Sequence, residues 1–260
     1  MDLAHGLSGL LVGVLVGMTG VGGGSLMAPI LILLLGVAPA TAVGTDLWFA
    51  AITKSVGGAI HHSLGEPDWQ VVRRLAMGSL PASIATSLIL AQIDTGQIKQ
   101  GLIISALGVI LLMTAAATFA WGRVQGIVLR LEMPIAAAYR KRQPGLTVAA
   151  GALLGVMVTL TSIGAGALGA VMLMALYPVR MTARRLVGTD IVHAVPLTVV
   201  AGIGHLVMGN VDLPLLGSLL IGSVPGIVIG SLLATRLSAS ILRPVLALVL
   251  AATGLKMILS

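Results

Sequence analysis

Residues 19–25, Thr19-Gly20-Val21-Gly22-Gly23-Gly24-Ser25, interrupt the first apolar segment of this chain with a run of glycines. A related stretch, Thr161-Ser162-Ile163-Gly164-Ala165-Gly166, interrupts a later segment, and the matched residues Gly22 and Gly164 are 142 positions apart. Non-helical backbone at membrane depth is tolerated only inside protein or beside a water-filled cavity. Two such breaks at matched positions therefore indicate a binding site between two halves of the chain.

The two halves also match outside the breaks. Gly44-Thr45-Asp46 returns as Gly188-Thr189-Asp190, and Gly78-Ser79-Leu80-Pro81 returns as Gly222-Ser223-Val224-Pro225, each 144 residues later. We therefore interpret the chain as a duplicated membrane domain. Its expected parts are a first repeat over residues 1–121, a cytoplasmic linker over 122–145 and a second repeat over 146–260.

Composition places this duplication in a membrane. The 260 residues are 57% hydrophobic and only 9% charged, whereas soluble domains carry about 25% charged residues. The chain has no cysteine, which excludes disulfides and thiolate metal sites. The net charge of +7 lies mostly between apolar segments, so it indicates cytoplasmic loops rather than a nucleic-acid partner.

The broken segments and the charges together predict the topology. Each broken segment consists of pieces of about a dozen residues, whereas a spanning helix needs about 20. If both breaks are re-entrant hairpins, each half crosses three times, and twelve of the fourteen Lys and Arg residues other than Lys54 fall on one side. If both segments cross instead, the split is eight against six, with no bias. The positive-inside rule thus predicts an all-α membrane protein of two inverted repeats, each a hairpin plus three transmembrane helices, with both termini outside the cytoplasm.

The helix that follows each break begins with free backbone amides and a partial positive charge, which together suit an anion. The expected substrate-binding residues are Thr19, Gly22, Gly23, Gly24, Ser25, Thr161, Ser162, Gly164 and Gly166. The other interpretation is that these glycines only allow helices to pack closely.

Ionisable residues inside the spans are candidates for coupling or gating. Asp46 and Asp190 either carry protons or cap the amides of a facing hairpin. Lys54 either attracts an anion or pairs with one of these aspartates, although its matched residue is Thr198. His61 and His205 complete the predicted set, because histidine exchanges protons near neutral pH.

The pattern Gly13-x-x-x-Gly17-x-x-Gly20-x-Gly22-Gly23-Gly24, followed by Pro29 and Ala42-Val43-Gly44-Thr45-Asp46, resembles the opening motif of the TauE/SafE sulfite exporter family. This family is also called the 4-toluene sulfonate uptake permease family. The second break departs from the pattern at Thr159, Ser162 and Ala165. The resemblance implies a multi-pass carrier of sulfite, sulfoacetate or another organosulfonate in the bacterial inner membrane, with proton coupling.

The resulting prediction is a secondary transporter that moves a small sulfur-containing anion by alternating access, with no cofactor. The alternatives are a passive anion channel and a transition-metal permease. An intramembrane hydrolase is disfavoured because no GxSxG motif surrounds Ser25. The chain also shows no nucleotide-binding loop, so any use of ATP would require another chain.

Overall fold

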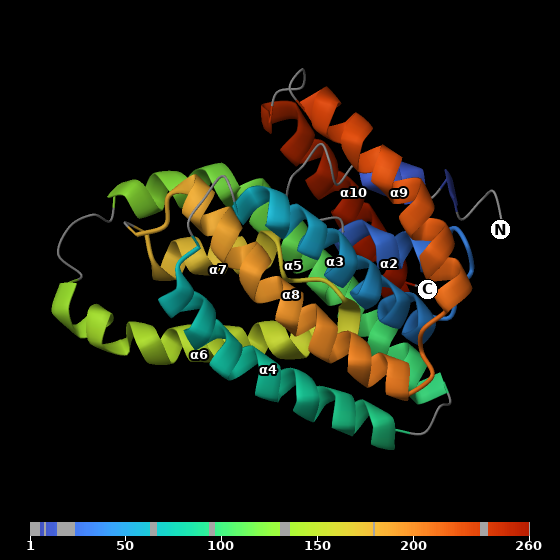
Figure 1. The fold of residues 1–260 in the computed structure, drawn as a ribbon. Coiled ribbons are helices and arrows are strands. Elements are labelled where there is room, and N and C mark those ends of the chain that lie inside the picture. Colours follow the sequence, from blue (N-terminus) through green and yellow to red (C-terminus); the bar gives the residue numbers. More distant parts are fainter. Residues whose placement is uncertain are drawn as a thin grey trace.

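The computed structural model describes residues 6–7, 9–14, 24–62, 67–93, 97–130, 136–178, 180–234 and 239–259. These residues form helices joined by short loops, and no strand occurs among them (Figure 1). The helices are α2 (Gly24–Leu33), α3 (Pro39–His62), α4 (Trp69–Gln92), α5 (Gln97–Arg130), α6 (Ala136–Thr161), α7 (Ala167–Leu176), α8 (Ala183–Val207), α9 (Leu213–Ala234) and α10 (Ala239–Leu259).

Within the described ranges, five helical segments are long and apolar enough to cross a membrane. They are Trp69–Gln92, Lys99–Ala120, Arg142–Thr161, Arg184–Val207 and Leu213–Gly230. Many of their apolar side chains face outward, such as Leu88 at 60% exposure and Ile221 at 61%. The predicted all-α, multi-pass membrane protein is therefore confirmed.

The arm before the second break is longer than its apolar stretch suggests. An apolar piece of about a dozen residues is expected there, but α6 runs for 26 residues from Ala136. Its extra turns contain Arg140-Lys141-Arg142 and three alanines, which are good helix formers whether or not lipid surrounds them. The expected linker is also helical in part, since residues 122–130 continue α5 and residues 136–145 begin α6.

Helices α4 and α6 pack against each other at glycines. A Cβ on Gly78 would overlap the carbonyl oxygen of Val148, and a Cβ on Gly155 would overlap that of Ser79. Only a hydrogen side chain permits this approach of two backbones.

The same contacts recur in another part of the molecule. Gly222 of α9 meets the backbone of Gly6 and Leu10, while Gly13 meets that of Ser223. The α9 residues follow their α4 counterparts by 144 positions, and the N-terminal residues precede their α6 counterparts by 142. The sequence match therefore corresponds to a match of backbone contacts.

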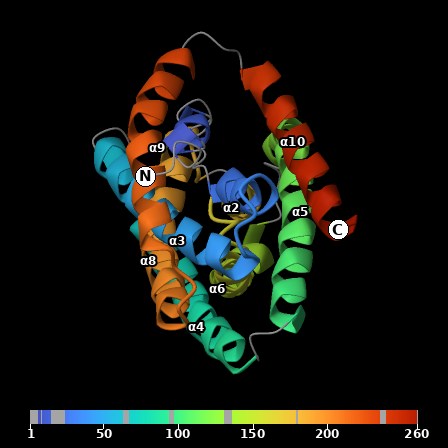
Figure 2. The same cartoon turned by 90° about the vertical axis from the view of Figure 1, so that its right-hand side faces the viewer.

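The matched helices also pack on each other as antiparallel pairs. In α3 and α8, the Trp48 Nε1 donates a hydrogen bond of 3.0 Å to the Gly202 carbonyl, and a Cβ on Gly44 would lie 3.0 Å from the His205 Cβ. Early residues of α3 thus meet late residues of α8. Helices α5 and α10 lie side by side (Figure 2), with Gly108 against the side chain of Ile258 near the end of α10.

Candidate functional site

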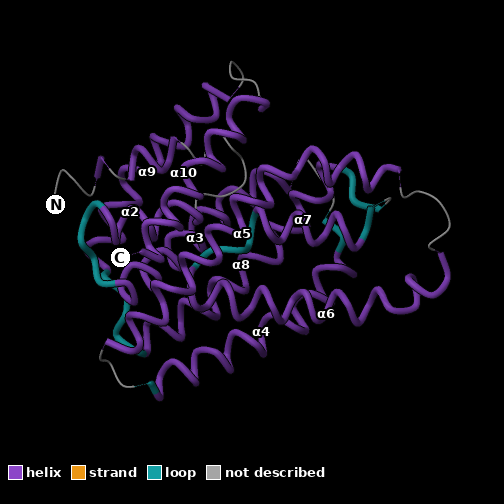
Figure 3. The backbone as a smooth tube through the Cα atoms, turned by 180° about the vertical axis from the view of Figure 1, so that it is seen from behind, coloured by secondary structure: helices purple, strands orange, loops and turns teal. Residues whose placement is uncertain are grey.

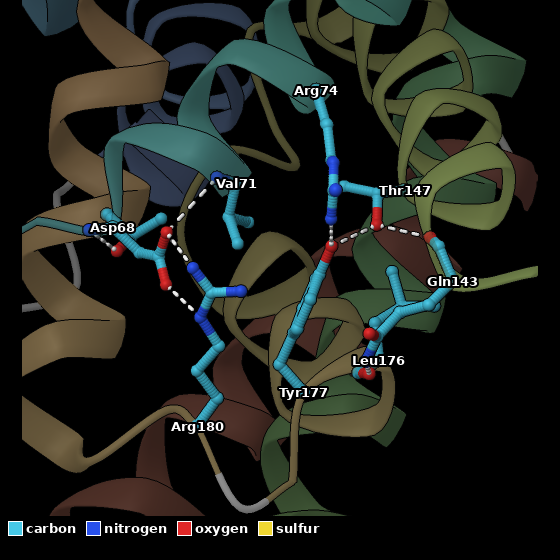
Figure 4. Close-up of polar contacts among 9 residues, drawn as sticks. Asp68, Val71, Arg74, Gln143, Thr147, Leu176, Tyr177 and Arg180 are labelled. Atoms are coloured by element: carbon cyan, nitrogen blue, oxygen red, sulfur yellow. Dashed lines mark hydrogen bonds and ion pairs between the residues drawn. The ribbon is translucent and has the colours of Figure 1, made fainter. Parts of the chain in front are cut away.

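The chain turns back on itself at the second glycine break. About two turns into α6, the Gln143 side-chain amide donates to the Leu176 carbonyl at the end of α7. One turn later, the Thr147 and Tyr177 hydroxyls lie 2.7 Å apart (Figure 4). Helices α6 and α7 therefore form a hairpin that the chain enters and leaves at the same end. Figure 3 shows the connection between them as a short loop surrounded by helices.

Positive φ angles shape the tip of this hairpin. Ser162 has φ 61°, Gly164 has φ 127° and Gly166 has φ 145°. The left-handed region suits glycine and is unusual for serine, so the backbone here is held by its surroundings. The Thr161 hydroxyl contributes by accepting a hydrogen bond of 3.1 Å from the Ile163 amide.

Helix α7 begins at Ala167 without a side-chain cap, because its N-cap residue is Gly166. The first backbone bonds are donated by Gly169 to the Gly164 carbonyl at 2.9 Å and by Ala170 to the Gly166 carbonyl at 2.8 Å. The two amides that precede them start the helix without a helical acceptor. The start of α7 thus has the free amides and partial positive charge expected of an anion site.

A carboxylate from α8 lies against this helix start. A Cβ on Gly169 would be only 2.5 Å from the Asp190 Oδ1, so the glycine leaves room for the carboxylate. Asp190 is 7% exposed. The structure therefore brings together two elements of the predicted site, the second glycine break and its matching aspartate.

Lys54 joins α3 to the hairpin tip. Its Nζ donates a hydrogen bond of 2.6 Å to the Ala165 carbonyl, and the residue is 7% exposed. It interacts electrostatically with Asp190 first and with Asp46 second. The ammonium group therefore stabilises the tip directly and compensates part of the negative charge beside it.

Asp46 is fully buried on α3, and it lies against the other short helix, α2. Its carboxylate lies near the Ser162 hydroxyl and the Ala28 amide. Neither contact has the geometry of a hydrogen bond, so both carboxylate oxygens and the Ser162 hydroxyl have no hydrogen-bond partner among the described residues. Buried polar groups without partners are rare and costly. A ligand or a proton bound between the Asp46 carboxylate and the Ser162 hydroxyl would remove this cost.

The threonines of the two Gly-Thr-Asp motifs have a structural role. The Thr189 hydroxyl accepts a hydrogen bond of 2.9 Å from the Asp68 amide, and the Thr45 hydroxyl accepts one of 3.1 Å from the Asp212 amide. Asp68 caps α4 through the Val71 amide. Each motif thus holds the beginning of a distant helix while it places its aspartate in the cluster.

The predicted set of coupling residues omits His193, which the structure places in this region. His193 is 1% exposed, and its Nε2 lies 2.8 Å from the Ser79 hydroxyl. It follows Asp190 by three residues, so both side chains lie on one face of α8. Its Nδ1 has no hydrogen-bond partner in the part of the chain that the structure describes. The available sequence signal was this spacing from Asp190.

Of the other predicted residues, His205 is fully described, and it lies away from this cluster. His205 is fully buried, with its Nε2 2.9 Å from the Thr159 carbonyl, but it lies fifteen residues beyond Asp190, or about 22 Å along α8. His61 belongs to α3, and its side chain is outside the described part. Gly24 and Ser25 begin α2, without a described Ser25 side chain. Thr19, Gly22 and Gly23 lie outside the described residues.

A polar network holds the base of the hairpin to α4 (Figure 4). Arg180 Nη2 donates to the Asp68 Oδ1 at 2.8 Å, and Arg74 Nη1 donates to the Tyr177 hydroxyl at 3.2 Å. The position that matches Tyr177 in the first half is Leu35, which cannot accept such a bond. This anchoring is therefore a feature of the second hairpin.

Comparison with known proteins agrees with this architecture. Residues 6–257 match the family described as "Sulfite exporter TauE/SafE". The chain is also similar to the "Probable membrane transporter protein YjnA" of Bacillus subtilis (strain 168), with 39% identity over 228 residues that cover 83% of each chain. No solved structure matches the chain significantly.

Proposed function

Because the chain belongs to the TauE/SafE family and is a membrane transporter, we propose that it moves a small sulfur-containing anion across the bacterial inner membrane. Sulfite, sulfoacetate and other organosulfonates are the proposed substrates. Transport would be secondary, by alternating access, and coupled to protons. The single observation that carries the anion assignment is the Lys54 ammonium bound 2.6 Å from the Ala165 carbonyl, at the uncapped start of α7.

The polar groups at the tip of the hairpin between α6 and α7 suit a sulfonate or sulfite group. Such a group offers three acceptor oxygens and no proton to donate, while the hairpin offers backbone amides, the Ser162 hydroxyl and the Lys54 ammonium. Charge-assisted hydrogen bonds to an oxyanion are the strong ones.

Alternating access needs two halves that can exchange roles, and we propose that they are inverted repeats. The support comes from the recurring backbone contacts of Gly78 and Gly222 and from the antiparallel packing of α3 on α8. In known transporters of this kind, the substrate lies where the repeats meet and one repeat rocks against the other. The first repeat, linker and second repeat would then be residues 1–121, 122–145 and 146–260, with both termini outside the cytoplasm.

The test is counterflow in vesicles that contain the purified protein. Labelled sulfite or a labelled sulfonate should accumulate transiently when the vesicles are preloaded with unlabelled anion. Gly164→Val should abolish counterflow while leaving the protein in the membrane, because φ 127° strains any side chain at this position. Gly101→Val is the matched control, since nothing lies within 4 Å of its added Cβ.

Two results would contradict the proposal. Normal counterflow by the Gly164→Val variant would show that the hairpin tip is not part of the transport site. Anion currents through the wild-type protein without any counterflow would indicate a passive channel instead.

A further inference from the structure

Both aspartates lie against the short helices that follow the glycine breaks. The Asp190 carboxylate touches Gly169 in the first turn of α7, and the Asp46 carboxylate lies near Ala28 of α2. Both helices have ten residues, long enough to present a polarised N-terminal end. A carboxylate and a substrate oxyanion have the same charge and seek the same amides, so they compete for this position.

The two aspartates differ in how well they are compensated. Asp190 is the principal electrostatic partner of Lys54, and Asp46 is the weaker one. Asp46 is fully buried, and within the described part of the chain neither of its oxygens has a hydrogen bond. The same holds for the nearby Ser162 hydroxyl. Asp46 is therefore the carboxylate that gains most from taking up a proton, whereas Asp190 remains the counterion of Lys54.

We propose that the Asp46 carboxylate and the substrate anion are alternative occupants of one site, so that the anion binds only when Asp46 takes up a proton. This inference rests on the proposed function and adds its coupling mechanism. The proton comes from the aqueous side to which the site is open. It travels on the Asp46 carboxyl group with the anion and returns to water on the other side.

The charges that face Asp46 fix the stoichiometry. Lys54 faces it from the same helix, while Asp190 and His193 face the cluster from α8. With a neutral His193, two carboxylates and one ammonium give −1 in the empty site. With a protonated Asp46 and a bound monovalent anion, the charges of Asp190, Lys54 and the anion again give −1. One proton per monovalent anion thus avoids a second uncompensated charge in an apolar interior, which is strongly disfavoured.

The test measures proton uptake when the anion binds to the purified full-length protein in weakly buffered detergent solution. Methanesulfonate is a suitable probe because it stays ionised across the working range of pH, so any pH dependence arises from the protein. We expect one proton bound per anion and an apparent Kd that falls about tenfold for each unit decrease in pH. In Asp46→Asn, proton uptake should vanish and the Kd should become independent of pH.

Two further variants make the test specific. Asp190→Asn should keep one proton per bound anion, because Asp46 still titrates. Asp212→Asn is the matched control, since this carboxylate caps α9 through the Leu215 amide and belongs to no part of the cluster. It should behave as the wild type.

Vesicle transport separates this inference from the function on which it rests. Asp46→Asn should retain counterflow of methanesulfonate and lose accumulation driven by a pH gradient. Accumulation that persists in Asp46→Asn, or wild-type binding without proton uptake, would overturn the proposed exchange while leaving an anion transporter. Failure of the wild-type protein to bind or exchange any sulfonate or sulfite would overturn the proposed function itself.

Discussion

The replacement Lys54→Met tests the charge balance of the site through stability. It removes a hydrogen bond of 2.6 Å from an ammonium group to the Ala165 carbonyl, worth about 1.5–3 kcal/mol for a charged donor. It also leaves the buried Asp190 without its counterion. Removing one of two interacting buried charges leaves the other uncompensated, so we expect the free energy of unfolding at alkaline pH to fall by more than the hydrogen bond alone contributes.

The double variant Lys54→Met/Asp190→Asn separates the two contributions. It removes both charges, so the lost hydrogen bond is the only remaining cost. The free energy of unfolding should therefore fall by about 1.5–3 kcal/mol. The double variant should therefore be more stable than the single one. The measurement is denaturant-induced unfolding of the purified proteins in detergent, with the two single variants completing a double-mutant cycle.

Lys99 provides the matched control for this cycle. It is 5% exposed and, among the described residues, its ammonium contacts the Met208 Sδ at 3.7 Å. Lys99→Met should not interact energetically with Asp190→Asn. If Lys54→Met and Asp190→Asn also prove additive, Lys54 does not compensate Asp190 and the reasoning about charge balance is wrong.

Three further substitutions test the fold. Gly78→Ala should lower stability by about 1–3 kcal/mol through overpacking, because its Cβ would overlap backbone atoms of α6, whereas Gly217→Ala meets nothing within 4 Å and should not destabilise; equal melting temperatures would contradict the glycine contact. Trp48→Phe should cost about 1 kcal/mol by removing the hydrogen bond to Gly202, and an unchanged unfolding midpoint would count against this bond. Arg180→Ala should cost at most about 1 kcal/mol, since Arg180 is 41% exposed and solvent screens its ion pair; a loss above about 3 kcal/mol would show that the hairpin base depends on it.

The sequence predicts the second hairpin well because its cause is local. Glycines that adopt positive φ end one helix, and the next begins at Ala167, where the pattern places it. The length of α6 is not predicted, because hydropathy measures how much of a helix suits lipid, not where the helix begins. Backbone propensity carries α6 back through Arg140-Lys141-Arg142 to Ala136.

Besides the second glycine break, the sequence predicts the charged residues of the candidate site. Asp46, Asp190 and Lys54 stand out because a charge within an apolar span is costly. The contact of Lys54 with Ala165 joins residues 111 positions apart, and no spacing rule reaches that far. His193 is missed for a different reason. A comparison of repeats favours residues that recur, and the position matched to His193 is Phe49.

The residues that do not recur determine how the two halves differ. Lys54 is matched by Thr198, His193 by Phe49 and Tyr177 by Leu35, while the glycine contacts around them recur in pairs. If the halves are inverted repeats, identical halves would make the inward-open and outward-open states equal in energy. Lys54 donates to the hairpin of the second repeat, so its charge stabilises the tip of that hairpin. The duplicated backbone would then provide the inward-open and outward-open states. The polar side chains that do not recur would determine which of the two states is lower in free energy.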